Sequence, residues 1–371
     1  MTASQLPATI NPVADLAGHD DRAWYVAWNP TKPILASCSA DKSVRLYSYR
    51  EVSSESEPST PATSLKFSHN TTIPTGHTKT VRAIAWSPSG KTLATASFDS
   101  NIGIWEQEEG GEDEGTTGEW ECMSLLEGHE TECKSVAYSS TGTLLASCSR
   151  DKTVWIWEVH PDADFECMGV LMEHTQDVKC VAWHPTQEIL ASASYDDTIK
   201  LYLDDPSDDW YCAETLKGHD STVWSLAWEP SEGRYLASGS DDSTIRIWRV
   251  TPQGMSDIEA ECAIILEGHG KRPVQSLSWS KGIKTEDGSL GWLASAGSDG
   301  CVIVWEIKEH RSENADIKPS LSYRILAKLE GAHDVFDVNC VSWCPRRGFE
   351  DVLATAGDDG HVKVWRIAFN A

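Results

Sequence analysis

The chain has 371 residues, and its 57 Asp and Glu residues outweigh its 31 Lys and Arg residues to give a formal net charge of −26. This balance argues against nucleic acid and anionic membrane surfaces as main partners, because both are bound through clustered Lys and Arg. The first Lys or Arg is Arg22, and no apolar run approaches the roughly 20 residues of a membrane helix. We therefore expect a soluble cytoplasmic protein, with the nucleus as a second location.

A histidine opens each of seven repeats along the chain, and the spacing from His129 to His174 and from there to His219 is 45 residues. The seven are His19, His77, His129, His174, His219, His269 and His333. An apolar stretch follows each one and ends in an aromatic residue, typical of a half-buried strand. These aromatic residues are Trp28, Trp86, Tyr138, Trp183, Trp228, Trp279 and Trp343.

A second stretch in each repeat carries a hydroxyl residue, with an aspartate four residues later and an aromatic residue six beyond that. The hydroxyl residues are Ser37, Thr95, Ser147, Ser192, Ser238, Ser295 and Thr355. The aspartates are Asp41, Asp99, Asp151, Asp196, Asp242, Asp299 and Asp359. The final aromatic residues are Tyr47, Trp105, Trp157, Tyr202, Trp248, Trp305 and Trp365.

Imidazole, hydroxyl, carboxylate and indole can form one chain of hydrogen bonds that satisfies buried polar groups within a repeat. We predict such tetrads at His129, Ser147, Asp151 and Trp157, and in the same pattern at His219, Ser238, Asp242 and Trp248. In the first and fourth repeats a Tyr stands where the others have Trp, and a phenol can form a hydrogen bond as an indole does.

A period of about 40 to 45 residues is the length of a WD repeat. We predict an all-β chain that forms a single seven-bladed WD40 β-propeller over residues 1–371, and a strand near residues 13–16 that completes the seventh blade and removes its free edge. The predicted repeats are at about 13–49, 74–106, 120–158, 165–203, 210–249, 260–306 and 323–368.

Inserts between the predicted blades at 50–74, 106–119, 250–259 and 307–320 are expected to be solvated loops, and a further insert at 281–291 lies within blade six. The run from Glu106 to Glu121 carries many carboxylates and no basic residue. A solvated loop is the favoured interpretation, and a docking surface for a basic partner is the alternative.

The eleven cysteines include no Cys-x-x-Cys pair. Cys122, Cys167, Cys212 and Cys262 each lie seven residues before a repeat histidine, on separate predicted outer strands that are too far apart to share a metal. We therefore expect no metal and no cofactor, and interpret the cysteines as small buried hydrophobic residues in a reducing compartment.

His129, Ser147 and Asp151 also have the composition of a hydrolase triad. The same trio recurs around the ring, whereas catalysis needs one activated nucleophile beside a pocket. No phosphate-binding Gly-rich loop, His-Glu-x-x-His or nucleophile elbow occurs either. We therefore predict that the protein is not an enzyme and has no catalytic residues.

Two rings of residues are predicted to face outward around the central channel, where the His and Asp turns emerge. The residue before each Asp gives Ala40, Phe98, Arg150, Tyr195, Asp241, Ser298 and Asp358. The residue four before each first-strand aromatic gives Trp24, Arg82, Lys134, Lys179, Trp224, Gln275 and Asn339.

Blades two to four therefore gather four cations with aromatic neighbours, which are residue types that dominate binding hot spots. The predicted partner-binding residues are Arg150, Arg82, Lys134, Lys179, Trp24, Trp224, Tyr195 and Phe98. The alternative is that these rim charges only solvate the face.

Longer runs give a more specific resemblance. The runs CSRDKTVW at 148–155, HTQDVK at 174–179, ASYDDT at 193–198 and TVWSLAW at 222–228 are similar to the WD-repeat subunit of the cytosolic iron-sulfur protein assembly targeting complex. The resemblance implies a non-catalytic adaptor that ligates no cluster itself. The implied partners are an iron-only-hydrogenase-like cluster carrier, a small cysteine-bearing partner, a helical-repeat adaptor and apo iron-sulfur client proteins.

The resemblance also matches Arg150 to an exposed arginine of that family in a Ser-Arg-Asp-Lys turn. A different class of interaction protein is the first alternative, namely a WD40 substrate receptor of a ubiquitin ligase or of a chromatin-associated complex.

Overall fold

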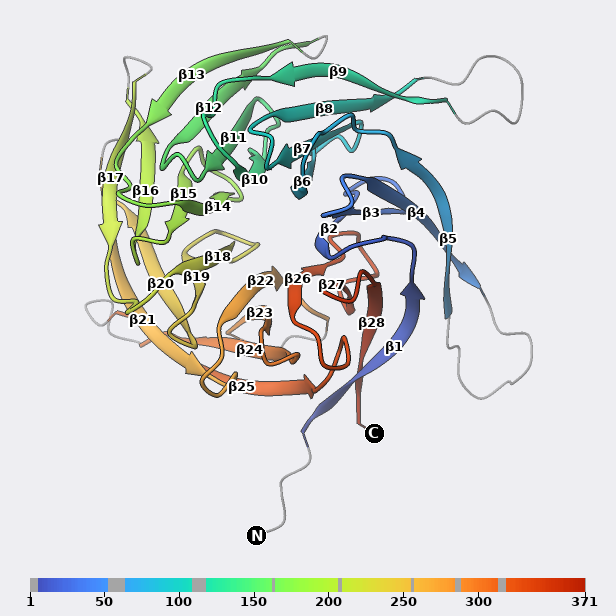
Figure 1. Cartoon of the computed structure of the whole chain (residues 1–371). Helices are drawn as coiled ribbons and strands as arrows, with labels where there is room; N and C mark the ends of the chain where they lie inside the picture. Colours follow the sequence, from blue (N-terminus) through green and yellow to red (C-terminus); the bar gives the residue numbers. More distant parts are fainter. Residues whose placement is uncertain are drawn as a thin grey trace.

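The computed structural model describes residues 6–52, 64–108, 118–161, 164–205, 209–254, 257–283, 288–312 and 318–370. These residues form seven antiparallel four-stranded sheets, which are arranged as blades in a ring (Figure 1). The architecture is therefore the predicted seven-bladed propeller. Within the described part of the chain, no helix has the length and apolar character needed to cross a bilayer.

The innermost strand of each blade follows the repeat histidine, and the second strand carries the hydroxyl residue. The innermost strands are β2 (Ala23–Trp28), β6 (Val81–Trp86), β10 (Cys133–Tyr138), β14 (Val178–Trp183), β18 (Val223–Trp228), β22 (Val274–Ser280) and β26 (Val338–Trp343). The second strands are β3 (Ile34–Ser39), β7 (Thr92–Ser97), β11 (Leu144–Ser149), β15 (Leu190–Ser194), β19 (Tyr235–Ser240), β23 (Ser289–Gly297) and β27 (Val352–Gly357).

The third strand of each blade carries the final aromatic residue of the repeat, and a fourth strand covers the outside. The third strands are β4 (Val44–Val52), β8 (Ile102–Gln107), β12 (Val154–Val159), β16 (Ile199–Asp204), β20 (Thr244–Pro252), β24 (Val302–His310) and β28 (Val362–Phe369). The outer strands are β5 (Ser64–Ile73), β9 (Trp120–Leu126), β13 (Phe165–Leu171), β17 (Trp210–Leu216), β21 (Ile258–Glu267), β25 (Ser320–Leu329) and, for blade seven, β1 (Ala8–Leu16).

Strand β1 closes the ring as predicted. It pairs antiparallel with β28 from Ala8 opposite Phe369 to Leu16 opposite Val362, so strands from the two extremes of the described chain belong to the same blade (Figure 1). The ladder shifts by one residue between Pro12 and Ala14, a place where a residue without an N–H is tolerated. With β1 in place, blade seven has four strands like the other blades.

The tetrads tie each blade to its turns. In blade three, His129 Nδ1 lies 2.9 Å from Asp151, and its Nε2 lies 2.9 Å from the Ser147 hydroxyl, which accepts from the Trp157 indole at 3.1 Å. The corresponding three distances in blade five are 2.7, 2.7 and 2.8 Å. Because the carboxylate can only accept, the imidazole donates through Nδ1 and accepts the hydroxyl proton at Nε2, and every group in the chain is satisfied.

The two tyrosine blades differ from each other. The Tyr202 hydroxyl lies 3.3 Å from Ser192, whereas the Tyr47 hydroxyl lies close to Ser37 without a hydrogen bond of ordinary geometry. The expectation that a phenol replaces the indole therefore holds for blade four and is wrong for blade one. His19 still bonds Ser37 and Asp41 there, at 2.8 and 2.9 Å, so the ring is intact.

The apolar core lies between blades, where the inner strands of one sheet pack on those of the next. One cluster joins Ala36, Leu46 and Ile73 of blade one to Ile84 and Trp105 of blade two. Buried alanines on the second strands let neighbouring sheets approach closely, and burial of such clusters is the main favourable contribution to folding.

All four loop expectations between blades are wrong in part, since strands enter each insert; β20 and β21 do so at the two ends of 250–259, and β8 reaches Gln107 in 106–119. The insert at 50–74 contains the outer strand of blade one, since β5 covers 64–73, and the remainder at 53–63 lies outside the described residues. Strand β24 likewise continues through His310 into the insert at 307–320. Outer strands are largely exposed and therefore have no continuous apolar pattern to reveal them. The middle of the acidic run, 109–117, also lies outside the described residues.

The expectation for the cysteines also needs correction. Cys122, Cys167 and Cys262 are exposed on their outer strands, while Cys340 and Cys344 are buried. Each of these three cysteines lies directly across the ladder from a tetrad tryptophan, on the outermost strand of its blade. Burial of cysteine therefore follows the layer of the blade and is not general to the chain.

Candidate binding site at the channel mouth

A β-bulge at the start of every innermost strand builds the site. In each blade, the ladder between the first and second strands skips the second residue of the innermost strand, as between Val81 and Ala83 in blade two and between Cys133 and Ser135 in blade three. A bulge turns its extra side chain out of the regular pleat. The skipped residues are Trp24, Arg82, Lys134, Lys179, Trp224, Gln275 and Asn339, which are the whole of the second predicted ring.

The first predicted ring lies beside them and is fixed by backbone bonds. Arg150 N donates to Glu132 O at 3.0 Å, Tyr195 N donates to Asp177 O at 2.9 Å, and the same bond occurs in every blade. This contact reveals a third ring that the sequence analysis missed, two residues before each bulge. Its members are Arg22, Thr80, Glu132, Asp177, Thr222, Pro273 and Asp337.

These rings enclose a cavity of about 310 Å³ at the mouth of the channel. All seven bulge residues line it, and the other lining residues are Phe98, Arg22, Asp337 and Asp358. Two predicted binding residues, Arg150 and Tyr195, are not part of the wall, and they lie exposed beside it, Arg150 with 59% of its side chain accessible.

In blades two to four the cations lie over aromatic rings. The Arg82 guanidinium is 4.7 Å from the ring centre of Trp24, and the Lys134 ammonium is 4.1 Å from that of Phe98. Lys179 lies between two rings, 5.2 Å from Tyr195 and 5.0 Å from Trp224. Cation–π attraction of this kind holds the side chains in place without using their N–H donors. We refer to Arg82, Lys134, Lys179 and their aromatic neighbours as the cationic half of the mouth.

Two carboxylates of the third ring partly neutralise this half. Glu132 pairs with Lys134 and with Arg150, the latter at 3.4 Å, and Asp177 pairs with Lys179 at 3.2 Å. Burial lowers the pKa of the Lys134 ammonium, and Glu132 partly offsets this effect. Arg82 has no carboxylate partner among the described residues, and burial lowers its pKa as well. Unpaired and partly dehydrated, Arg82 is the strongest local attractant for an anion.

Blades six and seven form a different half of the mouth, in which polar side chains bond to one another. At the boundary in blade five, the Trp224 indole donates to Asp241 at 2.5 Å, and in blade six the Gln275 amide donates to Ser298 at 2.6 Å. The Asn339 amide donates to Asp358 at 2.8 Å and to Ala23 O at 3.0 Å. Because these groups are satisfied within the chain, they offer less to a ligand than the cationic half does.

Thiols lie directly below the mouth. Burial raises the pKa of Cys38, of Cys180 and of Cys340, the last to about 11, and a raised pKa keeps a thiol protonated at neutral pH. Burial thus disfavours the thiolate form at all three positions.

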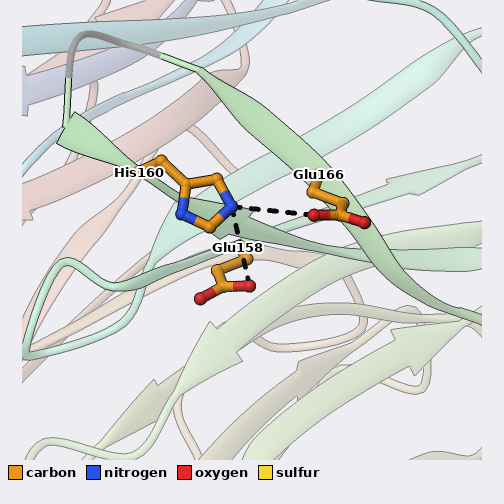
Figure 2. A group of neighbouring side chains, drawn as sticks. All are labelled: Glu158, His160 and Glu166. Carbon is orange, nitrogen blue, oxygen red and sulfur yellow. Dashed lines mark ion pairs between the residues drawn. The ribbon is translucent and has the colours of Figure 1, made fainter.

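One group of side chains in the described residues has ligand atoms close enough to hold a metal ion. It consists of Glu158, His160 and Glu166, with His160 Nε2 at 3.7 and 3.8 Å from the two carboxylates (Figure 2). All three lie on the outside of blade three, between β12 and β13, remote from the channel. Their side chains are 36% to 75% accessible, as expected for contacts between polar groups at the surface.

The seven blades and their tetrads define the class of the protein, a WD-repeat β-propeller. The sequence profile of the WD domain, G-beta repeat family matches seven segments, at residues 10–48, 67–106, 120–158, 165–202, 210–249, 260–306 and 324–366. The matched repeats start earlier than the predicted ones in blades one and two because each includes part of the preceding outer strand.

Known relatives narrow the class. A protein of Mycosarcoma maydis named probable cytosolic iron-sulfur protein assembly protein 1 is 51% identical, and the similarity covers 98% of this chain and 94% of that protein. Proteins of the same name from Cryptococcus neoformans and Malassezia globosa are 43% and 52% identical, over 96% and 79% of this chain and 99% and 91% of their own lengths. The chain belongs to the family of cytosolic iron-sulfur protein assembly protein 1.

Proposed function

We propose that the protein is a non-catalytic scaffold of cytosolic iron-sulfur protein assembly, and that the cationic half of its mouth binds an acidic segment of a partner. The observation that carries the proposal is the cavity of about 310 Å³, walled by Arg82, Lys134 and Lys179 on a chain of net charge −26. Cations among aromatic rings form the type of site that recognises carboxylates with geometric specificity. The names of the relatives supply the process in which such a scaffold acts.

The geometry of the tetrads supports the non-catalytic part of the proposal. The Ser147 hydroxyl donates a hydrogen bond to His129 and accepts one from the Trp157 indole. A substrate therefore has no free approach to this hydroxyl. The same arrangement recurs around the ring, and none of these hydroxyls lines the cavity at the mouth.

The proposed partners are an iron-only-hydrogenase-like cluster carrier, a small cysteine-bearing protein, a helical-repeat adaptor and apo iron-sulfur client proteins, in the cytosol and the nucleus. A rigid ring that holds two such partners at once raises their effective concentration toward each other. Arg150 and Tyr195 extend the surface beyond the cavity wall and, with Trp24, Trp224 and Phe98, complete the proposed contact area.

The test compares tagged wild-type protein with two variants, purified from native cytosol with partners identified by mass spectrometry. Arg150→Glu reverses an exposed charge, and Lys134→Met with Lys179→Met removes two cations while keeping side-chain length. Arg272→Glu, an exposed charge on the same face in blade six, is the matched control.

We expect assembly factors and iron-sulfur apoproteins to copurify with wild type and with Arg272→Glu, and to be depleted at least tenfold with the other two. An unchanged partner profile in both mouth variants at equal expression would rule out this surface. Enrichment of a cullin adaptor or of histones with wild type would replace the proposed function by that of a ligase receptor or a chromatin-associated protein.

A further inference from the structure

A second cavity, of about 530 Å³, opens on the face of the propeller opposite the channel mouth. It lies where the innermost strands β22 and β26 end, and the mouth lies where the same strands begin. Its apolar walls are Trp279 and Trp343 with Pro230 and Pro345. None of the residues of the mouth contributes to it, so the two cavities are separate features.

The two indoles that line the cavity form no hydrogen bond between blades among the described residues. In four blades the indole at the end of the innermost strand donates to a backbone carbonyl of the preceding blade, as Trp28 does to Ser342 O at 3.0 Å and Trp183 to Ala137 O at 3.0 Å. Trp279 instead donates within its own blade, to Leu290 O at 2.9 Å. Trp343 has a buried indole N–H that donates to nothing in the described structure.

The insertion in blade six explains the change. Gly291 has a φ of +94°, and a side chain there would meet Ser280 O at 2.1 Å, so only glycine lets β23 come this close to β22. The ladder between β23 and β24 also shifts between Ser289 and Trp292. The Leu290 carbonyl is thereby presented to Trp279, which turns away from blade five.

The rim of the cavity is cationic. Lys281 and Arg347 are exposed, and neither pairs with a carboxylate among the described residues. Glu350, the acidic member of the wall, already accepts from Gly348 N at 2.8 Å. On a chain with 57 acidic residues, two cations left without a partner beside an apolar pocket are a local exception to the prevailing charge.

We infer that this cavity is a docking site for an acidic peptide segment of a partner protein, with one apolar side chain between Trp279 and Trp343 and carboxylates toward Lys281 and Arg347. Trp279 and Trp343 supply the apolar contact area that such a side chain would cover. Charge complementarity selects the acidic character of the segment.

The experiment pans a randomised heptapeptide phage-display library on the full chain carrying Lys134→Met and Lys179→Met, which reduces competition from the mouth. The same library is panned on that protein with Lys281→Glu and Arg347→Glu added. The matched control adds Lys271→Glu and Arg272→Glu instead, which reverse two exposed charges of blade six on the mouth face.

We expect enriched peptides that combine acidic residues with one apolar or aromatic residue. As fluorescent synthetic peptides they bind the control at least tenfold more tightly than the Lys281→Glu, Arg347→Glu protein. Enrichment of neutral or basic sequences, or equal binding to both proteins, would overturn the inference. A short oligothymidylate that binds as tightly, with the same dependence on the two cations, would assign the site to phosphate and overturn it as well. Neither outcome bears on the scaffold function proposed for the mouth, because the panned proteins already lack Lys134 and Lys179.

Discussion

The two halves of the channel mouth occupy equivalent backbone positions and treat their polar groups in opposite ways. In the cationic half, Arg82, Lys134 and Lys179 rest on aromatic rings 4.1 to 5.2 Å away. In the other half, Gln275 and Asn339 form direct hydrogen bonds to neighbouring turns of 2.6 and 2.8 Å. The same bulge thus serves recognition on one side and internal stabilisation on the other.

The difference shows that the repeat fixes the direction in which a side chain points. It does not fix whether the polar groups of that side chain are free to bind another molecule. A side chain that bonds within the ring contributes to stability, and its removal leaves a buried partner unsatisfied. A cation held over a ring keeps donors free for another molecule. Substitutions in the two halves should therefore affect different measurements.

The largest expected effect concerns the layer that both halves share. Burial alone would raise the pKa of the tetrad aspartates, but bonds from the histidine and the turn outweigh it, and the pKa of all seven is lowered. A lowered folded-state pKa adds stability above the unfolded value of about 4, and this stability is lost as pH falls through the folded value. We expect Tm to hold from pH 7 to about 5 in this respect and to drop steeply below about 4.

Asp151→Asn isolates one of these groups. Because it no longer titrates, the difference in unfolding free energy between wild type and this variant should shrink as pH falls below about 4. A difference that stays constant between pH 7 and pH 3 would show that the tetrad carboxylate does not cause the acid sensitivity.

The next prediction tests whether the tetrads beneath the cationic half of the mouth and beneath its boundary in blade five contribute equally to the unfolding free energy. Asp151→Ala in blade three and Asp242→Ala in blade five each remove a carboxylate that binds a histidine and a turn N–H, the latter at 2.9 Å in both blades. We expect each to lower the unfolding free energy by about 1–3 kcal/mol, measured by urea denaturation. A wild-type value for Asp151→Ala would rule out the tetrad account in that blade.

The smallest effect compares the halves directly. Asn339→Leu keeps the shape of the side chain and loses two hydrogen bonds, so we expect a loss of about 1–2 kcal/mol. Lys179→Leu removes a cation held by one ion pair and two rings, and we expect less than about 1 kcal/mol. Urea denaturation measures both, and equal losses would remove the distinction between the halves.

The sequence predicted the blade number and the closing strand because the tetrads are polar residues at fixed spacings. Polar atoms inside a sheet must be satisfied, and that requirement leaves a periodic mark at residues such as His129 and Asp151. Outer strands such as β5 have no comparable requirement, since solvent satisfies one face. The insert at 50–74 therefore had the composition of a loop although it holds a strand.

For the mouth, the spacing before each aromatic residue predicted the ring of bulge residues but not the bulge itself, which is a feature of strand pairing. The pairing of Glu132 with Lys134 and Arg150 also could not be predicted. It depends on a backbone bond that brings the turn of one strand pair beside the start of the innermost strand. Glu132 and Asp177 would have been found by inspecting the residue two positions before each bulge residue.

The pairing of β1 with β28 sets an order on the assembly of the molecule during its synthesis. The partner of Leu16 is Val362, so β1 leaves the ribosome long before β28 and waits for it unpaired. Until then blade seven has no outer strand and the growing ring has an open edge, the state in which sheet proteins are most prone to associate wrongly. Final closure is a contact of very large sequence separation, and contacts of this kind form more slowly than the local hairpins of a blade.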